Sequence, residues 1–178
     1  MRKVIFIFGL LAGIIVSIFI FISMALIEAG KTPTTNELVG YATIVIALSM
    51  IFFGIKSYRD NHQNGVIKFW KGIQVGLLIT LVASLIYTFT WETYKLVRPE
   101  KYQAVVDYYF ECQINKVKAE GASPEKIESA VNKFENMKAL LKNPLLRFGM
   151  TMVEIIPVGV IITLISAGIL RKKELLPA

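Results

Sequence analysis

Four long apolar runs alternate with polar segments along the chain, and each run is long enough to cross a membrane. An α-helix rises about 1.5 Å per residue, so about 20 apolar residues span a hydrocarbon core of about 30 Å. The runs predict transmembrane helices over residues 4–27, 38–55, 73–91 and 145–170. The first run has the basic start of a signal peptide, but its apolar stretch is too long for one, and we expect a retained helix.

The segment between the third and fourth runs, residues 99–143, has apolar residues at helical spacing in two stretches. Between these stretches, Gly121 suits the end of one helix, Ser123 caps the next and Pro124 fits its first turn. The predicted fold is therefore all-α: a polytopic membrane protein, read as one membrane domain over residues 1–178, with an extracytoplasmic helical hairpin between helices three and four.

The charges indicate how the helices are oriented. Lys and Arg gather at the N-terminus, in the loop after the second run and at the C-terminus, whereas the short first loop has only Lys31 and the 92–143 segment is nearly balanced, with nine basic and eight acidic residues. The positive-inside rule then places both termini in the cytoplasm and residues 99–143 outside. The basic residues that decide this are Arg2, Lys3, Lys56, Arg59, Lys68, Lys71, Arg171, Lys172 and Lys173.

Composition excludes several classes of protein. The chain has 178 residues, 54% hydrophobic and only 19% charged, with a mean hydropathy of +0.57, which is outside the range of ordinary soluble domains. One cysteine, Cys112, and one histidine, His62, cannot make an intramolecular disulfide or a Cys/His zinc site. The basic residues behind the net charge of +7 are placed as membrane topology requires, and they do not form a patch for nucleic-acid binding. No catalytic or nucleotide-binding motif is present, so we expect no enzyme, no cofactor and no metal.

Small residues recur at a spacing of four in three of the runs, where they would let helix backbones approach closely. They are Gly9, Gly13 and Ser17 in the first run, Gly72, Gly76, Thr80, Ser84 and Thr88 in the third, and Gly159, Thr163 and Ala167 in the fourth.

Glu154 is the one ionisable residue well inside a predicted span. A carboxylate there is costly unless it faces the bundle interior or water, or is protonated. Pro157, one turn later, leaves the carbonyl of Val153 without its helical partner. The two residues form a candidate proton or cation site, completed across the bundle by Thr80, Ser84 or Thr88. In the alternative structural reading, Glu154 bonds to those hydroxyls or pairs with Arg147 or with a lysine of the hairpin.

The segment from Phe53 to Gly65 reads as a loop in which Asn64-Gly65 forms a tight turn. Its basic residues, with those that precede the third run, are candidate contacts to lipid headgroups: Lys56, Arg59, Lys68 and Lys71. The alternative is a loop that fixes topology and binds no ligand.

The hairpin has more apolar surface than two short helices need, with Tyr108, Tyr109, Phe110, Leu140 and Leu141. We expect it to dock on the bundle or to form a homo-oligomer or partner contact.

Two functions stay open besides contact with the lipid bilayer. One is a membrane-embedded interaction or scaffold subunit, which the single intramembrane charge favours, and the other is a small transporter or channel component that uses Glu154.

Several stretches together resemble a bacterial family of small four-span membrane proteins of unknown function. They are residues 51–61, Asn64-Gly65, residues 76–80, residues 142–145 and residues 154–159, so the resemblance covers nearly the whole chain. It implies a complete single-domain protein in the cytoplasmic (inner) membrane of a Gram-negative bacterium, and it implies no activity or site.

Overall fold

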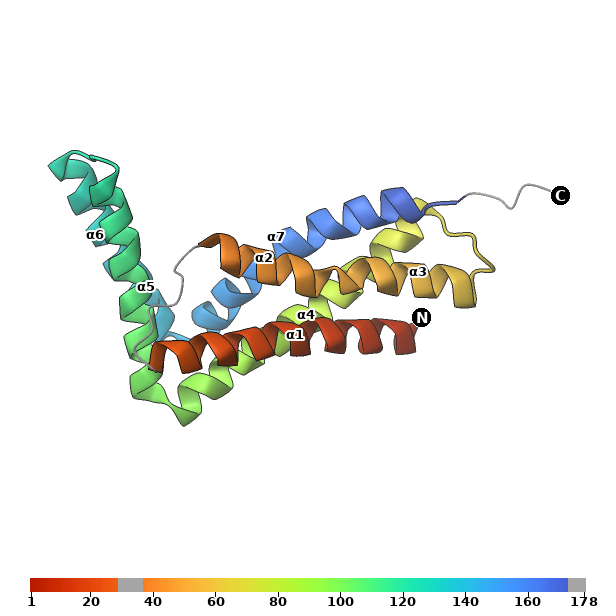
Figure 1. Cartoon of the computed structure of the whole chain (residues 1–178), viewed down its shortest axis with the longest axis horizontal. Coiled ribbons are helices and arrows are strands. Elements are labelled where there is room, and N and C mark those ends of the chain that lie inside the picture. The colour runs from red at the N-terminus through yellow and green to blue at the C-terminus, as the bar shows by residue number, and fades with distance from the viewer. Residues whose placement is uncertain (29–36, 173–178) are drawn as a thin grey trace.

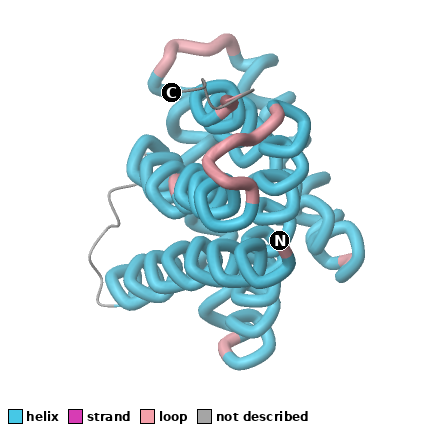
Figure 2. The backbone as a smooth tube through the Cα atoms, turned by 90° about the vertical axis from the view of Figure 1, so that its right-hand side faces the viewer, coloured by secondary structure: helices cyan, strands magenta, loops and turns pink. Residues whose placement is uncertain are grey.

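The computed structural model describes residues 1–28 and 37–172 of the chain, and the described residues are almost entirely helical (Figures 1 and 2). Lys31 and Lys173, which entered the charge argument, lie outside the described residues. The all-α prediction is confirmed. The helices are α1 (Arg2–Glu28), α2 (Glu37–Leu48), α3 (Met50–His62), α4 (Phe69–Val97), α5 (Pro99–Ala119), α6 (Pro124–Lys142) and α7 (Pro144–Leu170).

Four stretches in the described part of the chain are long and apolar enough to cross a membrane: Arg2–Ala25, Ala42–His62, Phe69–Val97 and Pro144–Leu170. The four predicted spans are therefore confirmed, and the chain is a multi-pass membrane protein. Consecutive spans run in opposite directions, so the N-terminus, the 63–68 connection and the end of α7 share one end of the bundle, called the loop end here (Figure 1). The α5–α6 hairpin occupies the other end, called the hairpin end.

The second span is longer than predicted and has a break. The prediction that residues 56–62 form a loop is wrong, because α3 continues to His62 and the turn at Asn64 and Gly65, with φ of 49° and 77°, follows it. A helix keeps its backbone hydrogen bonds as it leaves the membrane, so polar side chains alone do not end it. The break falls at Ser49, whose hydroxyl donates to the carbonyl of Ile46 at 2.6 Å.

The small residues pack the bundle as predicted, with α4 between α1 and α7. A Cβ atom added at Gly13 would lie 2.7 Å from Cβ of Ile86. Ser17 and Thr90 are joined by a hydrogen bond of 2.7 Å between their hydroxyls. Glycine thus sits where the helices touch most closely. On the α7 side, three pairs meet: Gly72 with Ala167, Gly76 with Thr163 and Thr80 with Gly159.

The loop end is held together by main-chain bonds between distant segments. The amide of Ile67 donates to the carbonyl of Lys172 and the amide of Lys172 donates to the carbonyl of Ile67, each at 3.1 Å. The Arg59 guanidinium also reaches the carbonyl of Leu170, at 3.5 Å. These contacts tie the end of α7 to the connection between α3 and α4.

The hairpin has the predicted turn. Gly121 has a φ of 72°, which favours glycine, and the Ser123 hydroxyl accepts a hydrogen bond from the Lys126 amide at 3.4 Å. Phe110 is buried against Phe134, with ring centroids 5.4 Å apart. The hairpin lies across the end of the bundle rather than continuing the direction of the spans (Figure 1).

Candidate intramembrane site around Glu154 and the hairpin base

Glu154 lies on the outer face of α7. Its side chain is exposed, whereas the next residue, Ile155, is fully buried. Val153 and Ile161 are also exposed on the outside of this helix, at 64% and 57%. Pro157 is exposed as well and lies inside the helix without ending it. The site is therefore on the side of the bundle and not in its interior.

The partner of Glu154 is Tyr87 of α4. The Tyr87 hydroxyl donates to Oε2 of Glu154 at 2.9 Å, and Tyr87 itself is buried. No other hydrogen bond or ion pair joins Glu154 to a side chain among the residues that the structure describes. One carboxyl oxygen is thus held from inside the bundle, while the side chain remains accessible from outside.

The predicted partners of Glu154 do not contact it. Thr80, Ser84 and Thr88 are buried, and their hydroxyls donate to carbonyls of their own helix at 3.0, 2.9 and 2.8 Å. A helical Ser or Thr reaches the carbonyl three or four residues earlier without any change in packing. The prediction that these hydroxyls complete a site with Glu154 and Pro157 is therefore not supported by the geometry.

Arg147 pairs with Glu92 and not with Glu154, the partner considered for it from the sequence. Its Nε donates to Oε1 of Glu92 at 2.7 Å and its Nη2 donates to Oε2 at 2.6 Å, which is a two-pronged ion pair. Its Nη1 donates to the carbonyl of Leu141 at 2.8 Å, although Arg147 is only 5% exposed. One buried guanidinium thus joins α4, α6 and α7.

Sequence reasoning missed this ion pair, although a signal was present. Glu92 and Arg147 have opposite charges and flank the hairpin, close to the ends of the third and fourth spans. Antiparallel helices bring such positions together at one end of a bundle. The pair fixes the base of the hairpin.

Aromatic residues complete the hairpin base. Trp91 of α4 and Tyr102 of α5 meet edge to face with ring centroids 6.1 Å apart, and Lys95 lies 5.5 Å from the centroid of the Tyr102 ring. Tyr102 and Val105 pack against the core of the bundle. The expected docking of the hairpin is thus seen at its base. Tyr109, farther out on α5, and Leu140, near the base of α6, remain exposed, at 53% and 46%.

The four candidate lipid-contacting residues lie at the loop end and differ in exposure. Lys56 and Lys68 are exposed. Arg59 pairs with Asp60 at 2.7 Å, and Lys71 donates to Gln74 at 2.8 Å. Lys56 also lines an open hollow of about 540 Å³ on the side of the bundle, with Phe8, Met50, Phe53, Ser57, Asp60 and Asn61.

Among the described residues, no three His, Cys, Asp or Glu side chains come together in a group that could hold an ion. The one cysteine, Cys112, is half-buried in α5.

Comparison with known proteins gives one finding. The sequence model of a family described as "Protein of unknown function (DUF4199)" matches residues 7–172, which is most of the chain. No curated protein and no solved structure matches it.

Proposed function

The chain belongs to the DUF4199 family, whose description names no activity, and from its own residues we propose that it is a membrane-embedded interaction protein. It contacts a partner helix in the bilayer through the outer face of α7. The partner offers a hydrogen-bond donor to the carboxyl group of Glu154. The observation that carries the proposal is the exposed position of Glu154 on the outer face of α7.

A carboxyl group facing acyl chains is unfavourable. Placing an ionised carboxylate at the centre of a membrane helix costs about 3 kcal/mol, and lipid tails offer no donor to offset that cost. Tyr87 supplies one hydrogen bond, to Oε2 at 2.9 Å, and among the described residues no side chain bonds to Oε1. A second helix with a Ser, Thr, Asn, Gln, Tyr, Lys or Arg side chain would cover that oxygen.

The rest of the face suits a helix contact. Gly149 and Gly168 lie on the outside of α7 with open space where a side chain would be, so a neighbouring backbone could approach them. Val153, Ile161 and Ile165 supply apolar surface between them, with exposures of 64%, 57% and 56%. Packing and one hydrogen bond are the forces that join helices in lipid.

Transport through Glu154 is the less favoured function. A transported proton or cation would need a polar route that passes this carboxyl group, and neither of the two described surface hollows includes it. The hydroxyls of Thr80, Ser84 and Thr88, which would have lined such a route, are bonded within their own helix.

The proposal includes the membrane and the orientation. The basic residues gathered at the loop end support the placement of both termini in the cytoplasm, with the hairpin outside, in the cytoplasmic membrane of a bacterium. In that orientation, Lys56, Arg59, Lys68 and Lys71 lie at the level of the inner-leaflet headgroups.

Photo-crosslinking tests the partner contact. A benzophenone amino acid replaces Ile161 on the proposed face or, as a control, Leu11 on α1, which is 42% exposed. We expect a protein crosslink from position 161 and only lipid adducts from position 11. A crosslink in vesicles of purified protein identifies a second copy as the partner, and one found only in native membranes identifies another protein.

Substitution of Glu154 tests the role of its carboxyl group in the same assay. Glu154→Gln keeps a hydrogen-bonding side chain and should keep the crosslink. Glu154→Leu should weaken association by about 1 kcal/mol, or about fivefold. Lipid adducts alone at position 161, or a crosslink of equal yield in Glu154→Leu, would contradict the proposal.

A further inference from the structure

The hairpin is joined to the spans without flexible linkers. Arg98 alone separates α4 from α5, and Asn143 alone separates α6 from α7. The Asn143 side chain accepts hydrogen bonds from the amides of Leu145 and Leu146 at 3.0 and 3.4 Å, so it caps the start of α7. The direction of the hairpin is therefore set by the helices that it connects.

Side-chain contacts at the base fix the same direction. Arg147 joins Glu92 of α4 to the carbonyl of Leu141 in α6. On the other side, Tyr102 of α5 packs against Trp91. Both helices of the hairpin are thus attached to the end of the bundle by contacts at their bases.

The hairpin is longer than the bundle is wide. Helices α5 and α6 have 21 and 19 residues, which makes each about 30 Å long. Helices pack about 9 Å apart, so four of them make an end about 20 Å across. The outer part of the hairpin consequently extends beyond the bundle and over the surrounding bilayer. Figure 1 shows it crossing the end of the spans and leaning away from them toward its tip.

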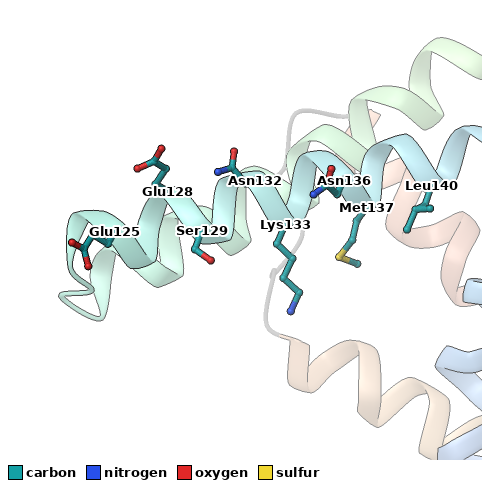
Figure 3. Close-up of a pocket in the computed structure, with 8 residues that line it drawn as sticks. All are labelled: Glu125, Glu128, Ser129, Asn132, Lys133, Asn136, Met137 and Leu140. Atoms are coloured by element: carbon teal, nitrogen blue, oxygen red, sulfur yellow. The ribbon is translucent and has the colours of Figure 1, made fainter.

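One face of α6 points toward the bilayer side. Ser129, Lys133 and Met137 project from α6 on the side where α2 lies, whereas Glu128 and Asn132 point away from it (Figure 3). An open hollow of about 630 Å³ lies along α6 and is lined by residues of both sides, Glu128 and Asn132 included. On the first face the side chains are polar toward the tip, with Ser129 and Lys133, and apolar near the base, with Met137 and Leu140.

This order of side chains matches the tilt of the hairpin. The base, which is closest to the spans, carries the apolar residues, and the tip, which is farthest, carries the polar ones. Below the base, Leu145 and Leu146 in the first turn of α7 are 79% and 45% exposed. Exposed apolar side chains therefore lie on either side of the junction between α6 and α7.

We propose that this face of α6 rests on the phospholipid surface of the leaflet at the hairpin end. The Lys133 ammonium group binds a lipid phosphate, while Met137 and Leu140 contact the glycerol and upper acyl region. A lipid surface is the occupant because this face points to the side on which the spans lie, and the bilayer surrounds the spans. The proposal does not depend on the contact proposed for α7, which lies in the bilayer interior.

Fluorescence quenching tests the proposal on the full chain. With Cys112 replaced by serine, a cysteine is placed at Met137 or, as a matched control, at Glu135. Glu135 lies at nearly the same depth along α6, but about 200° around the helix, and it is exposed. Each cysteine is labelled with the fluorophore NBD, and the protein is reconstituted into phosphatidylcholine and phosphatidylglycerol vesicles that contain headgroup-level nitroxide lipid.

We expect several-fold stronger quenching by nitroxide lipid at position 137 than at position 135, and the reverse order with aqueous iodide. Lys133→Glu should reduce the lipid quenching at position 137. Equal lipid quenching at both positions would overturn the proposal, as would a position 137 shielded from both quenchers, since a protein would then cover this face. If the Met137 variant does not fold, a cysteine at Leu140 takes its place with the same expectations.

Discussion

Gly76 shows at the scale of one residue how closely the spans pack. A Cβ atom there would lie 2.6 Å from Cγ2 of Thr163, whereas one added at Gly168 would meet nothing within 4 Å. We expect Gly76→Ala to lower the free energy of unfolding by about 1–3 kcal/mol through overpacking. Gly168→Ala, in α7, should leave the free energy of unfolding within about 0.5 kcal/mol of the wild-type value. Unfolding in bicelles measures both, and equal effects would contradict the packing of α4 on α7.

The ion pair of Glu92 with Arg147 gives a second prediction at this scale. Arg147→Lys keeps the charge and loses the two-pronged geometry, and we expect a loss of about 2 kcal/mol in stability. A double-mutant cycle with Glu92→Gln and Arg147→Gln should give a coupling energy of about 1–3 kcal/mol. Additive effects of the two substitutions would show that the pair contributes nothing beyond its separate side chains.

The sequence identified Glu154 as the unusual residue but could not identify its partner. Hydropathy alone makes a carboxyl group inside an apolar run stand out. Glu154 bonds to Tyr87 rather than to Thr80 or Thr88 because of the rotation of α7 about its axis and the length of the tyrosine side chain. Neither of these can be read from the residues around Glu154 in the sequence. The same rotation put Glu154 on the outside of the bundle.

At the scale of the element, the hairpin carries an interaction that responds to pH. Lys138 donates to Asp107 at 2.7 Å, and this hydrogen bond lowers the pKa of the Asp107 carboxyl group, with a smaller contribution from Gln103. A lowered pKa in the folded state means that the pair stabilises the hairpin fully above about pH 5. Its contribution is lost as the pH falls below about 3.9 through the lowered pKa.

Asp107→Asn tests that interaction. Because both side chains are at least a third exposed, the contribution should stay below about 1 kcal/mol. Hydrogen exchange of α5 and α6 amides, corrected for intrinsic rates, should be faster in Asp107→Asn than in wild type near neutral pH. The difference should shrink as the pH falls below about 3.9 and vanish once the pH is below the lowered pKa of Asp107. A difference that persists in acid would assign the effect to packing, such as that of Lys138 over Phe110.

The hairpin turn could be predicted in detail because its signals are local. Gly121, Ser123 and Pro124 each favour one backbone geometry whatever surrounds them. The end of α3 could not be predicted in this way. Polar residues after Ile55 marked the membrane boundary, and a helix can continue past that boundary, as α3 does to His62. The break at Ser49 has no comparable signal, since a serine in an apolar helix usually leaves it intact.

At the scale of the whole molecule, the small-residue stripes predicted which surfaces would touch but not which helices would pair. The stripes of α1 and α7 each need a partner, and α4 provides a face for both. It uses Gly72 and Gly76 toward α7, and Val82 and Ile86 toward the glycines of α1. The arrangement places α4 at the centre and leaves the outer face of α7 open. This is why Glu154 can be both bonded to Tyr87 and accessible from outside.

Orientation gives the last prediction, because the loop end and the hairpin end of the bundle must lie on opposite sides of the membrane. Cysteines at His62 and Glu120, both exposed, in a Cys112→Ser background report the two sides. A membrane-impermeant maleimide should label position 120 in intact spheroplasts and position 62 only after the membrane is opened, since the basic residues cluster at the loop end. Labelling of both positions from one side would contradict the four-span fold. Labelling of position 62 alone in intact cells would keep the fold and reverse its orientation, and the lipid contact proposed for α6 would then face the inner leaflet.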